Sequence, residues 1–310
     1  MRPRDIGVRV AQLGLAALVV WFAWRALAPR WDEVQTARAE ITLRWTWILA
    51  SAALVITSYA ILIETWRSTL ARWGHALPYP LAMRIWVISN LGKYLPGKIW
   101  QITAMGTMAR DAGVPAVAAI GSSLITALIN LLAGGVVVLI AAAGAGLIPP
   151  VVSAVGAAGI VGFLLLPSVL PQLATRIAHW RGRDITMPAL RVSDVLRIFI
   201  GCTVAWCLYG IAFQWLAWGT LPGASGATRY YIATFTVSYL AGFLALFAPG
   251  GVGVREVGLL AMLPQFGLMS HGNAALVAVI SRVWLTVLEL LPGLVLLLVW
   301  PVRRTSSSDV

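Results

Sequence analysis

Two short stretches of this sequence place charged and polar residues beside a Pro-Gly pair inside otherwise apolar segments. In the first stretch, polar side chains surround Pro96 and Gly97, and these are Asn90, Lys93, Tyr94, Lys98 and Gln101. Proline lacks a backbone N–H and glycine permits conformations that end a helix, so the pair leaves backbone donors and acceptors unpaired. Two lysines next to such groups favour phosphate binding. Extension of both lysines to a membrane surface is the alternative.

The second stretch repeats this arrangement about half a chain later. It consists of Pro249, Gly250, Gly251, Gly253, Arg255 and Glu256. The glycines allow close approach of a ligand or a neighbouring helix, and the helix that follows them would present free N–H groups and a partial positive charge beside Arg255. Arg255 either contacts a ligand or pairs with Glu256. Glu256 either receives an ammonium headgroup or caps the new helix.

Arg282 and Glu289 lie seven residues apart in the last apolar segment. On a helix they share one face and are separated by about 10 Å of rise, so they cannot bond to each other. We therefore expect each to reach another segment, either as a structural ion pair or along a substrate pathway. Charges inside a membrane segment are costly and usually face the interior of the bundle.

No other group of residues in the sequence predicts catalysis. His75, His179 and His271 are scattered without metal-ligand spacing, and Glu256 has no acidic partner beside it. The glycines of the second stretch lack the strand-helix context of a dinucleotide site. Cys202 and Cys207 lie within one apolar run and predict neither a disulfide nor a metal site. We expect a protein without catalytic residues, metal or cofactor, which is not an enzyme.

The composition indicates which environment these residues occupy. The 310 residues are 60% hydrophobic and 11% charged, with a mean hydropathy of +0.86. This excludes a soluble globular protein, because too little polar surface is present to cover the chain in water. The net charge of +12 comes from basic residues near segment ends, which favours contact with anionic lipid over nucleic acid.

Apolar runs predict an all-α polytopic membrane protein of seven or eight transmembrane helices, forming a single membrane domain over residues 1–310. The predicted spans are 8–28, 45–64, 115–143, 151–171, 197–219, 229–248 and 273–300. The first of them reads as an uncleaved span, because it ends in tryptophans and an arginine instead of a small-residue cleavage site.

The basic loops predict a cytoplasmic N-terminus, provided that the stretch of about 85–104 enters the membrane and returns to the same side. Seven crossings would then leave Arg303 and Arg304 outside. Either residues 249–266 supply an eighth crossing, or the C-terminal tail is an exception to the rule that basic residues lie on the cytoplasmic side. The two breaks lie 249 − 96 = 153 residues apart, and a short helical piece and a Gly-containing turn follow each one. Such pairs of broken segments are typical of transporters built from two repeats, here about 45–171 and 195–300.

The motif from Asn90 to Trp100 and the motif from Pro249 to Glu256 together resemble the signature stretches of the lysylphosphatidylglycerol synthase transmembrane-region family. The resemblance extends to Trp66 and Arg282. It implies a protein that moves a lipid with a charged headgroup between leaflets, with two re-entrant elements meeting around a central cavity. The sequence departs from the family where Gly121-Ser-Ser-Leu124 replaces a charged pair. It also ends at Val310, so we expect no aminoacyl-transferase half.

These observations predict a flippase of the bacterial inner membrane, carrying a phospholipid or another lipid with a phosphate-bearing or aminoacylated headgroup. A membrane-embedded lipid-linked transferase, or an accessory subunit for hopanoid or glycolipid biosynthesis, is the alternative. Because no ATP site is visible, transport would follow a gradient or couple to ions or membrane potential. As partners we expect membrane lipids with anionic or zwitterionic headgroups and no nucleic acid. A homodimer and a complex with a lipid-modifying enzyme are both left open.

Overall fold

The computed structural model describes residues 41–94, 99–144, 149–164, 190–245 and 248–299, together with residues 32, 35, 169, 175, 176 and 179. Within these ranges every regular element is helical and no strand occurs, which confirms the all-α prediction. The predicted span 8–28 lies outside the described residues, as do Pro96, Gly97 and Lys98.

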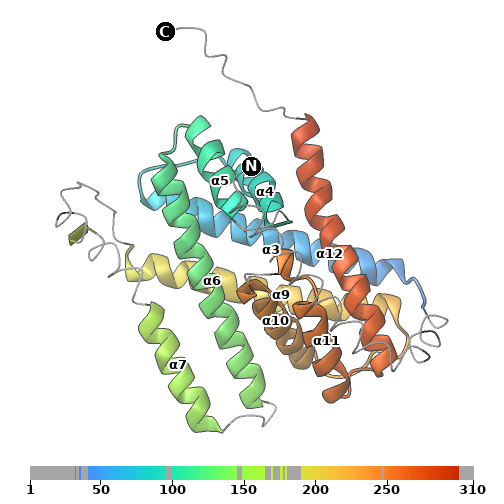
Figure 1. The fold of residues 1–310 in the computed structure, drawn as a ribbon. Coiled ribbons are helices and arrows are strands. Elements are labelled where there is room, and N and C mark those ends of the chain that lie inside the picture. Colours follow the sequence, from blue (N-terminus) through green and yellow to red (C-terminus); the bar gives the residue numbers. More distant parts are fainter. Residues whose placement is uncertain are drawn as a thin grey trace, which may run out of the picture.

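The elements before the middle loop begin with a long helix and a broken pair of short ones (Figure 1). They are α3 (Trp45–Arg72), α4 (Tyr79–Asn90), the 3-10 turn η2 (Leu91–Tyr94), α5 (Ile99–Asp111), α6 (Ala116–Gly144) and α7 (Pro150–Leu164). The elements after it are α9 (Val192–Thr220), α10 (Thr228–Leu244), the 3-10 turn η3 (Pro249–Gly251), α11 (Val254–Gln265) and α12 (His271–Val299).

Four helices of the described part are long and apolar enough to cross a membrane: α3, α6, α9 and α12. α10 is shorter than the span predicted at 229–248, since it has 17 residues and ends at Leu244 before the break at Pro249. At a rise of about 1.5 Å per residue it extends about 25 Å, less than the roughly 30 Å of a hydrocarbon core. α7 has 15 described residues.

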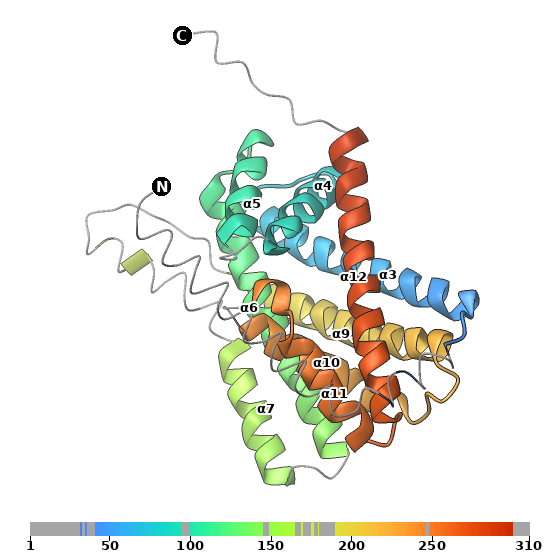
Figure 2. The ribbon, with the colours of Figure 1, turned by 45° about the vertical axis from the view of Figure 1, so that its right-hand side comes forward.

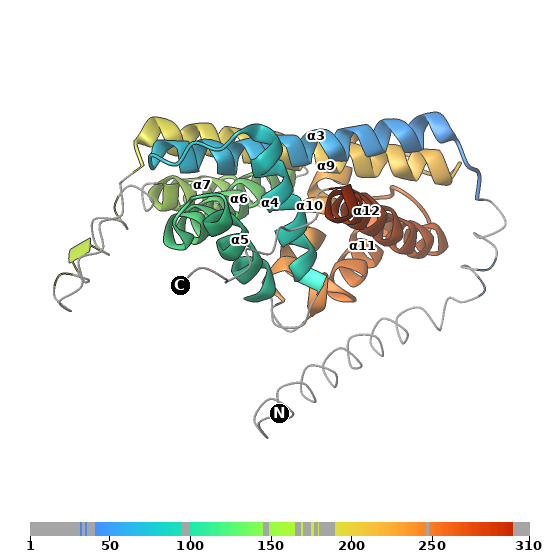
Figure 3. The same ribbon diagram turned by 90° about the horizontal axis from the view of Figure 1, so that it is seen from above.

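The first long helices of the two parts, α3 and α9, pack side by side in opposite directions (Figure 3). At one end Arg44 N donates to Gly219 O at 2.8 Å, and at the other Arg72 Nε lies 3.1 Å from Asp194 Oδ1. Gly219 permits this approach, because a Cβ there would lie 2.9 Å from the Ile48 side chain. The antiparallel pair forms a layer on which the remaining helices lie.

The element order of the first part recurs in the second. A long helix, a short helix, a 3-10 turn, another short helix and a 29-residue helix follow one another from α3 to α6 and from α9 to α12. The turns before the last helices match as well: Val114 N donates to Ala109 O at 2.9 Å and Leu268 N to Leu263 O at 3.0 Å. This correspondence supports an internal repeat, and the antiparallel α3 and α9 are what an inverted repeat requires.

The two broken pairs lie toward opposite ends of α12 (Figure 2). α4 and α5 are near its C-terminal half, whereas α10 and α11 are near its N-terminal half. The turns η2 and η3 nevertheless contact each other, so the two breaks meet between the halves. The bundle therefore brings together backbone that is at least 249 − 94 = 155 residues apart in the chain.

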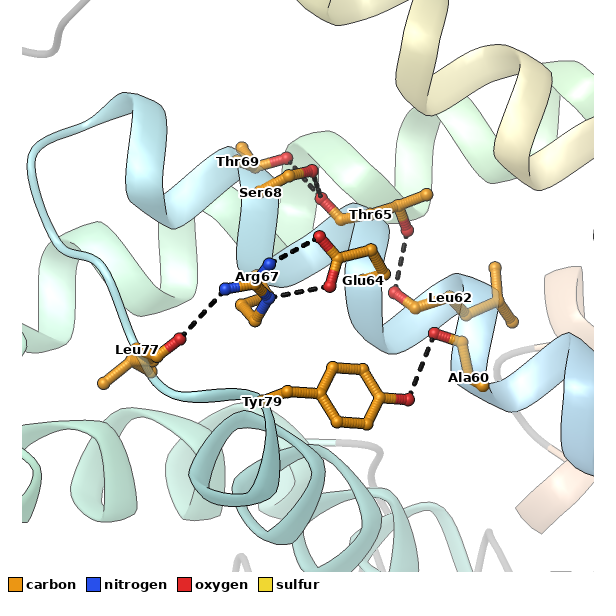
Figure 4. A network of polar contacts seen from close by, with 9 residues as sticks. All are labelled: Ala60, Leu62, Glu64, Thr65, Arg67, Ser68, Thr69, Leu77 and Tyr79. Atoms are coloured by element: carbon orange, nitrogen blue, oxygen red, sulfur yellow. Dashed lines mark hydrogen bonds and ion pairs between the residues drawn. The ribbon is translucent and has the colours of Figure 1, made fainter.

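A polar network fixes the end of α3 against α4 (Figure 4). Arg67 donates from Nε to Glu64 Oε2 at 2.7 Å and from Nη2 to Glu64 Oε1 at 2.8 Å, and its Nη1 donates to Leu77 O at 3.2 Å. The Tyr79 hydroxyl donates to Ala60 O at 3.4 Å. Both charged side chains are partly exposed, which fits a structural role at a helix end.

Replacing Glu64 with glutamine is expected to lower the free energy of unfolding by less than about 1 kcal/mol, because partly exposed ion pairs contribute little. Thermal unfolding of the purified protein in detergent measures this change. A loss of several kcal/mol would contradict the role of a partly exposed ion pair at a helix end.

Candidate functional site

A cavity of about 230 Å³ lies where the two breaks meet, between the two halves of the described chain. Side chains or backbone of α3, α4, η2, α5 and α6 line one part of it, and those of α9, α10, η3, α11 and α12 line the other. Its wall combines aromatic rings, hydroxyls and amides with four charged side chains, which are Lys93, Arg255, Arg282 and Glu289. A polar pocket inside an apolar bundle is the arrangement expected of a site for a charged ligand.

The structure brings many of the residues singled out in the sequence to this cavity. Those in its lining are Asn90, Lys93, Gln101, Gly250, Gly251, Arg255, Arg282 and Glu289. Pro249, Gly253 and Glu256 lie beside it, in η3 and at the start of α11. Tyr94 is the last residue of η2, and its side chain, like all of Pro96, Gly97 and Lys98, is outside the described part of the chain.

Lys93 and Glu289 link η2 to α12 across the cavity wall. Lys93 Nζ lies 2.7 Å from Glu289 Oε1, and the Tyr59 hydroxyl of α3 donates to the same oxygen at 2.9 Å. The side chains are only 19% and 8% exposed, so the charges are largely removed from solvent. Three elements of different halves are therefore joined at one carboxylate.

Arg282, about two turns before Glu289 in α12, binds the second break. Its Nη1 donates to Gly250 O at 2.8 Å, and its Nε lies 3.8 Å from Glu256 Oε1. Arg282 and Glu289 thus reach different segments, as their spacing predicts. Gly250 adopts a φ of 58°, a conformation that favours glycine and that turns its carbonyl away from a regular helix.

Glu256 closes the start of α11. Its Oε2 accepts a hydrogen bond of 2.6 Å from the backbone N of Gly253, which is the N-cap residue of that helix. This contact satisfies a backbone donor that would otherwise be free. Of the two roles that the sequence left open for Glu256, the contacts favour capping.

Arg255 is the most isolated charge of the site. It is 5% exposed, and its Cζ lies 4.8 Å from the ring centroids of both Phe235 and Tyr239 in α10. Its Nη2 has no hydrogen-bond partner in the described part of the chain. No described carboxylate lies within ion-pair distance of it, although the sequence suggested pairing with Glu256. Contacts with the two rings stabilise the guanidinium only in part.

The second break packs directly on the backbone of α10. A Cβ on Gly251 would lie 2.9 Å from the Cα and the carbonyl oxygen of Gly242, and Gly251 has a φ of 71°. Neither close approach nor this conformation is open to a larger residue without strain. The pair of glycines therefore sets the position of η3 at the cavity.

Several lining residues were not identified from the sequence. Tyr59, Tyr209, Tyr239, Thr126 and Asn130 belong to the long apolar helices or to α10, where aromatic and hydroxyl side chains resemble ordinary core. Asn130 is the one that could have been found, because an amide in the middle of a 29-residue apolar helix is unusual.

Ser123 also lines the cavity, and it belongs to the stretch Gly121-Ser-Ser-Leu124, where the sequence differs from the family pattern. Its hydroxyl bonds to Ala119 O at 2.8 Å and lies 2.6 Å from Met105 Sδ. α6 thus supplies hydroxyls and amides to the wall, and its described residues supply no charge.

The geometry agrees with a comparison of the whole sequence with known families. A family model described as "Lysylphosphatidylglycerol synthase TM region" matches residues 9–293, a range that includes both breaks and all four charged residues of the cavity. A comparison with curated proteins gave no match.

Proposed function

The chain belongs to the lysylphosphatidylglycerol synthase transmembrane-region family of lipid-handling membrane proteins, and we propose that it moves a lipid with a charged headgroup across the bacterial inner membrane. The cavity between the two halves is the headgroup path. The hydrocarbon chains of the lipid remain in the surrounding bilayer while the headgroup crosses.

The observation that carries this proposal is the buried guanidinium of Arg255, whose Nη2 has no hydrogen-bond partner among the described residues, in a cavity inside an apolar bundle. Moving a charged headgroup through hydrocarbon is costly, because its hydration is lost without replacement. A cavity that offers opposite charge and hydrogen-bond partners lowers this cost. Lys93, Arg282 and the amides of Asn90 and Gln101 line the same space and supply further partners.

The two broken pairs are proposed to enter the membrane from opposite sides and return. The crossings are then the helices α3, α6, α9 and α12 together with the two predicted spans 8–28 and 151–171, the second of which contains most of α7, which gives 4 + 2 = 6. An even number brings Arg303 and Arg304 to the cytoplasmic side together with the basic N-terminus, in agreement with the positive-inside rule. This resolves the conflict that seven crossings created for the C-terminal tail.

Single cysteines introduced into a Cys202→Ala/Cys207→Ala background test this topology. With a membrane-impermeant maleimide, Ser225→Cys in the loop between α9 and α10 should be labelled in intact spheroplasts. Ser307→Cys should be labelled only after permeabilisation. Labelling of Ser307→Cys from outside would mean an odd number of crossings and would contradict the proposed arrangement.

Transport itself is tested in liposomes that contain the purified protein and a headgroup-labelled phospholipid. The wild type should make inner-leaflet label accessible to a membrane-impermeant quencher faster than protein-free vesicles do. Arg255→Ala should fall to the protein-free rate, because the cavity loses the buried cation whose Nη2 is free to bind the headgroup. Arg229→Ala is the matched control, since Arg229 also lies over a ring, that of Tyr230, but outside the cavity. Equal rates for wild type and protein-free vesicles would refute the function.

A further inference from the structure

The charges around the cavity do not cancel. Its lining holds three basic side chains, Lys93, Arg255 and Arg282, and the carboxylate of Glu289; Glu256 adds a second carboxylate beside it. Three positive and two negative charges leave an excess of +1 among the described residues. Lys93 pairs with Glu289 and Arg282 pairs with Glu256, so the excess positive charge lies on Arg255.

Both carboxylates are already engaged. Glu289 Oε1 lies 2.7 Å from Lys93 Nζ and accepts the Tyr59 hydroxyl at 2.9 Å. Glu256 accepts from Gly253 N at 2.6 Å with Oε2 and lies 3.8 Å from Arg282 Nε with Oε1. A ligand ammonium group would have to displace one of these partners to reach a negative charge.

Arg255 carries the remaining charge and cannot lose it, because an arginine side chain stays protonated at all physiological pH values. The rings of Phe235 and Tyr239 hold its guanidinium, each with a centroid 4.8 Å from Cζ. Its Nη2 is a buried donor without a partner in the described chain. A buried cation with an unused donor is completed by an anion that accepts hydrogen bonds.

We infer that the cavity selects lipids whose headgroup carries one net negative charge, a phosphodiester with a neutral alcohol such as glycerol, and that Arg255 determines this selectivity. Aminoacylated headgroups with a net positive charge are disfavoured, since they would add charge to a cavity that already has an excess of +1. The inference rests on the proposed function and specifies its substrate class.

The chemistry that Arg255 recognises is that of a phosphate anion, and a lipid and a water-soluble phosphodiester share it. Binding is therefore measured with three probes: phosphatidylglycerol, lysyl-phosphatidylglycerol with the same acyl chains, and glycerophosphoglycerol, which has none. Native mass spectrometry of the full chain released from detergent micelles gives the bound fraction of each probe without requiring transport.

The wild type is expected to bind phosphatidylglycerol about tenfold or more tightly than the lysyl lipid, as one unpaired charge-assisted hydrogen bond suggests. Glycerophosphoglycerol should bind more weakly than phosphatidylglycerol. Arg255→Gln should lower the affinity for phosphatidylglycerol to that for the lysyl lipid, whereas Arg255→Lys should keep the preference. Arg229→Gln, on the exposed start of α10, should behave as the wild type.

Equal or tighter binding of the lysyl lipid by the wild type overturns the inference, and this comparison needs no variant to fold. Glycerophosphoglycerol binding as tightly as the lipid also overturns it, in favour of a soluble phosphodiester. The result of the binding experiment can be distinguished from the result of the liposome transport assay. Selective binding without translocation refutes transport alone, and translocation without preference between the two lipids refutes the selectivity alone.

Discussion

Replacing either Lys93 or Glu289 with methionine is expected to lower the free energy of unfolding by about 3 kcal/mol or more, because each change removes the opposite charge that contacts the other, largely buried side chain. Lys93 Nζ and Glu289 Oε1 are 2.7 Å apart, and the two side chains are 19% and 8% exposed. Thermal unfolding in detergent measures the loss.

The double variant Lys93→Met/Glu289→Met is the control. Because a buried ion pair can be replaced by apolar side chains at little cost, the double variant should recover most of the stability lost in either single one. A double variant as unstable as the sum of the two singles would mean that the residues do not act as a pair. The link between η2 and α12 would then depend on other contacts.

Replacing Gly251 with alanine is expected to have the largest effect on the second break. A φ of 71° alone lowers the free energy of unfolding by about 1 kcal/mol or more when the residue is not glycine. Overpacking of the added Cβ against the Gly242 backbone, at 2.9 Å, lowers it by roughly a further 1–3 kcal/mol. The melting temperature of the purified variant reports the sum.

Gly267→Ala provides the matched comparison. Gly267 has nearly the same φ, 66°, but an added Cβ would meet nothing within 4 Å. It should therefore show the backbone cost without the clash, and a smaller drop in melting temperature. Equal drops for the two variants would show that the approach of η3 to α10 is not required for stability.

Some features of the fold could be predicted because they depend on local sequence. The length and apolar character of α3, α6, α9 and α12 follow from composition, and the break at Pro249 follows from the conformational preferences of proline and glycine. The end of α10 at Leu244 could not be read from hydropathy. Residues 245–248 continue the apolar run, but Pro249 disfavours the helical conformation in the residue before it.

The partners of the site residues could not be predicted, because they come from distant segments. The seven-residue spacing of Arg282 and Glu289 correctly excluded a bond between them. However, Tyr59 is 230 residues from Glu289, and no local pattern relates the two. Periodicity gives the face of a helix on which a residue lies and does not give the helix that packs against that face.

The aromatic rings around Arg255 could not be predicted either, because they also come from another helix. Phe235 and Tyr239 lie four residues apart in α10, a spacing that any buried helix face shows. Only the packing of α11 on α10 turns this pair of rings into a support for a guanidinium. The sequence identified the charge at Arg255, and the structure was needed to find that no carboxylate among the described residues lies within ion-pair distance of it.

The central claim is that a lipid headgroup crosses through the cavity, and filling the cavity tests it most directly. Thr286 of α12 lines the cavity, whereas the adjacent Val287 is 50% exposed on the outer face of the bundle. In the liposome assay Thr286→Trp should reduce translocation to the protein-free rate, because an indole occupies much of the space of about 230 Å³. Val287→Trp should translocate as the wild type does. Undiminished translocation by a folded Thr286→Trp protein would contradict a path through this cavity.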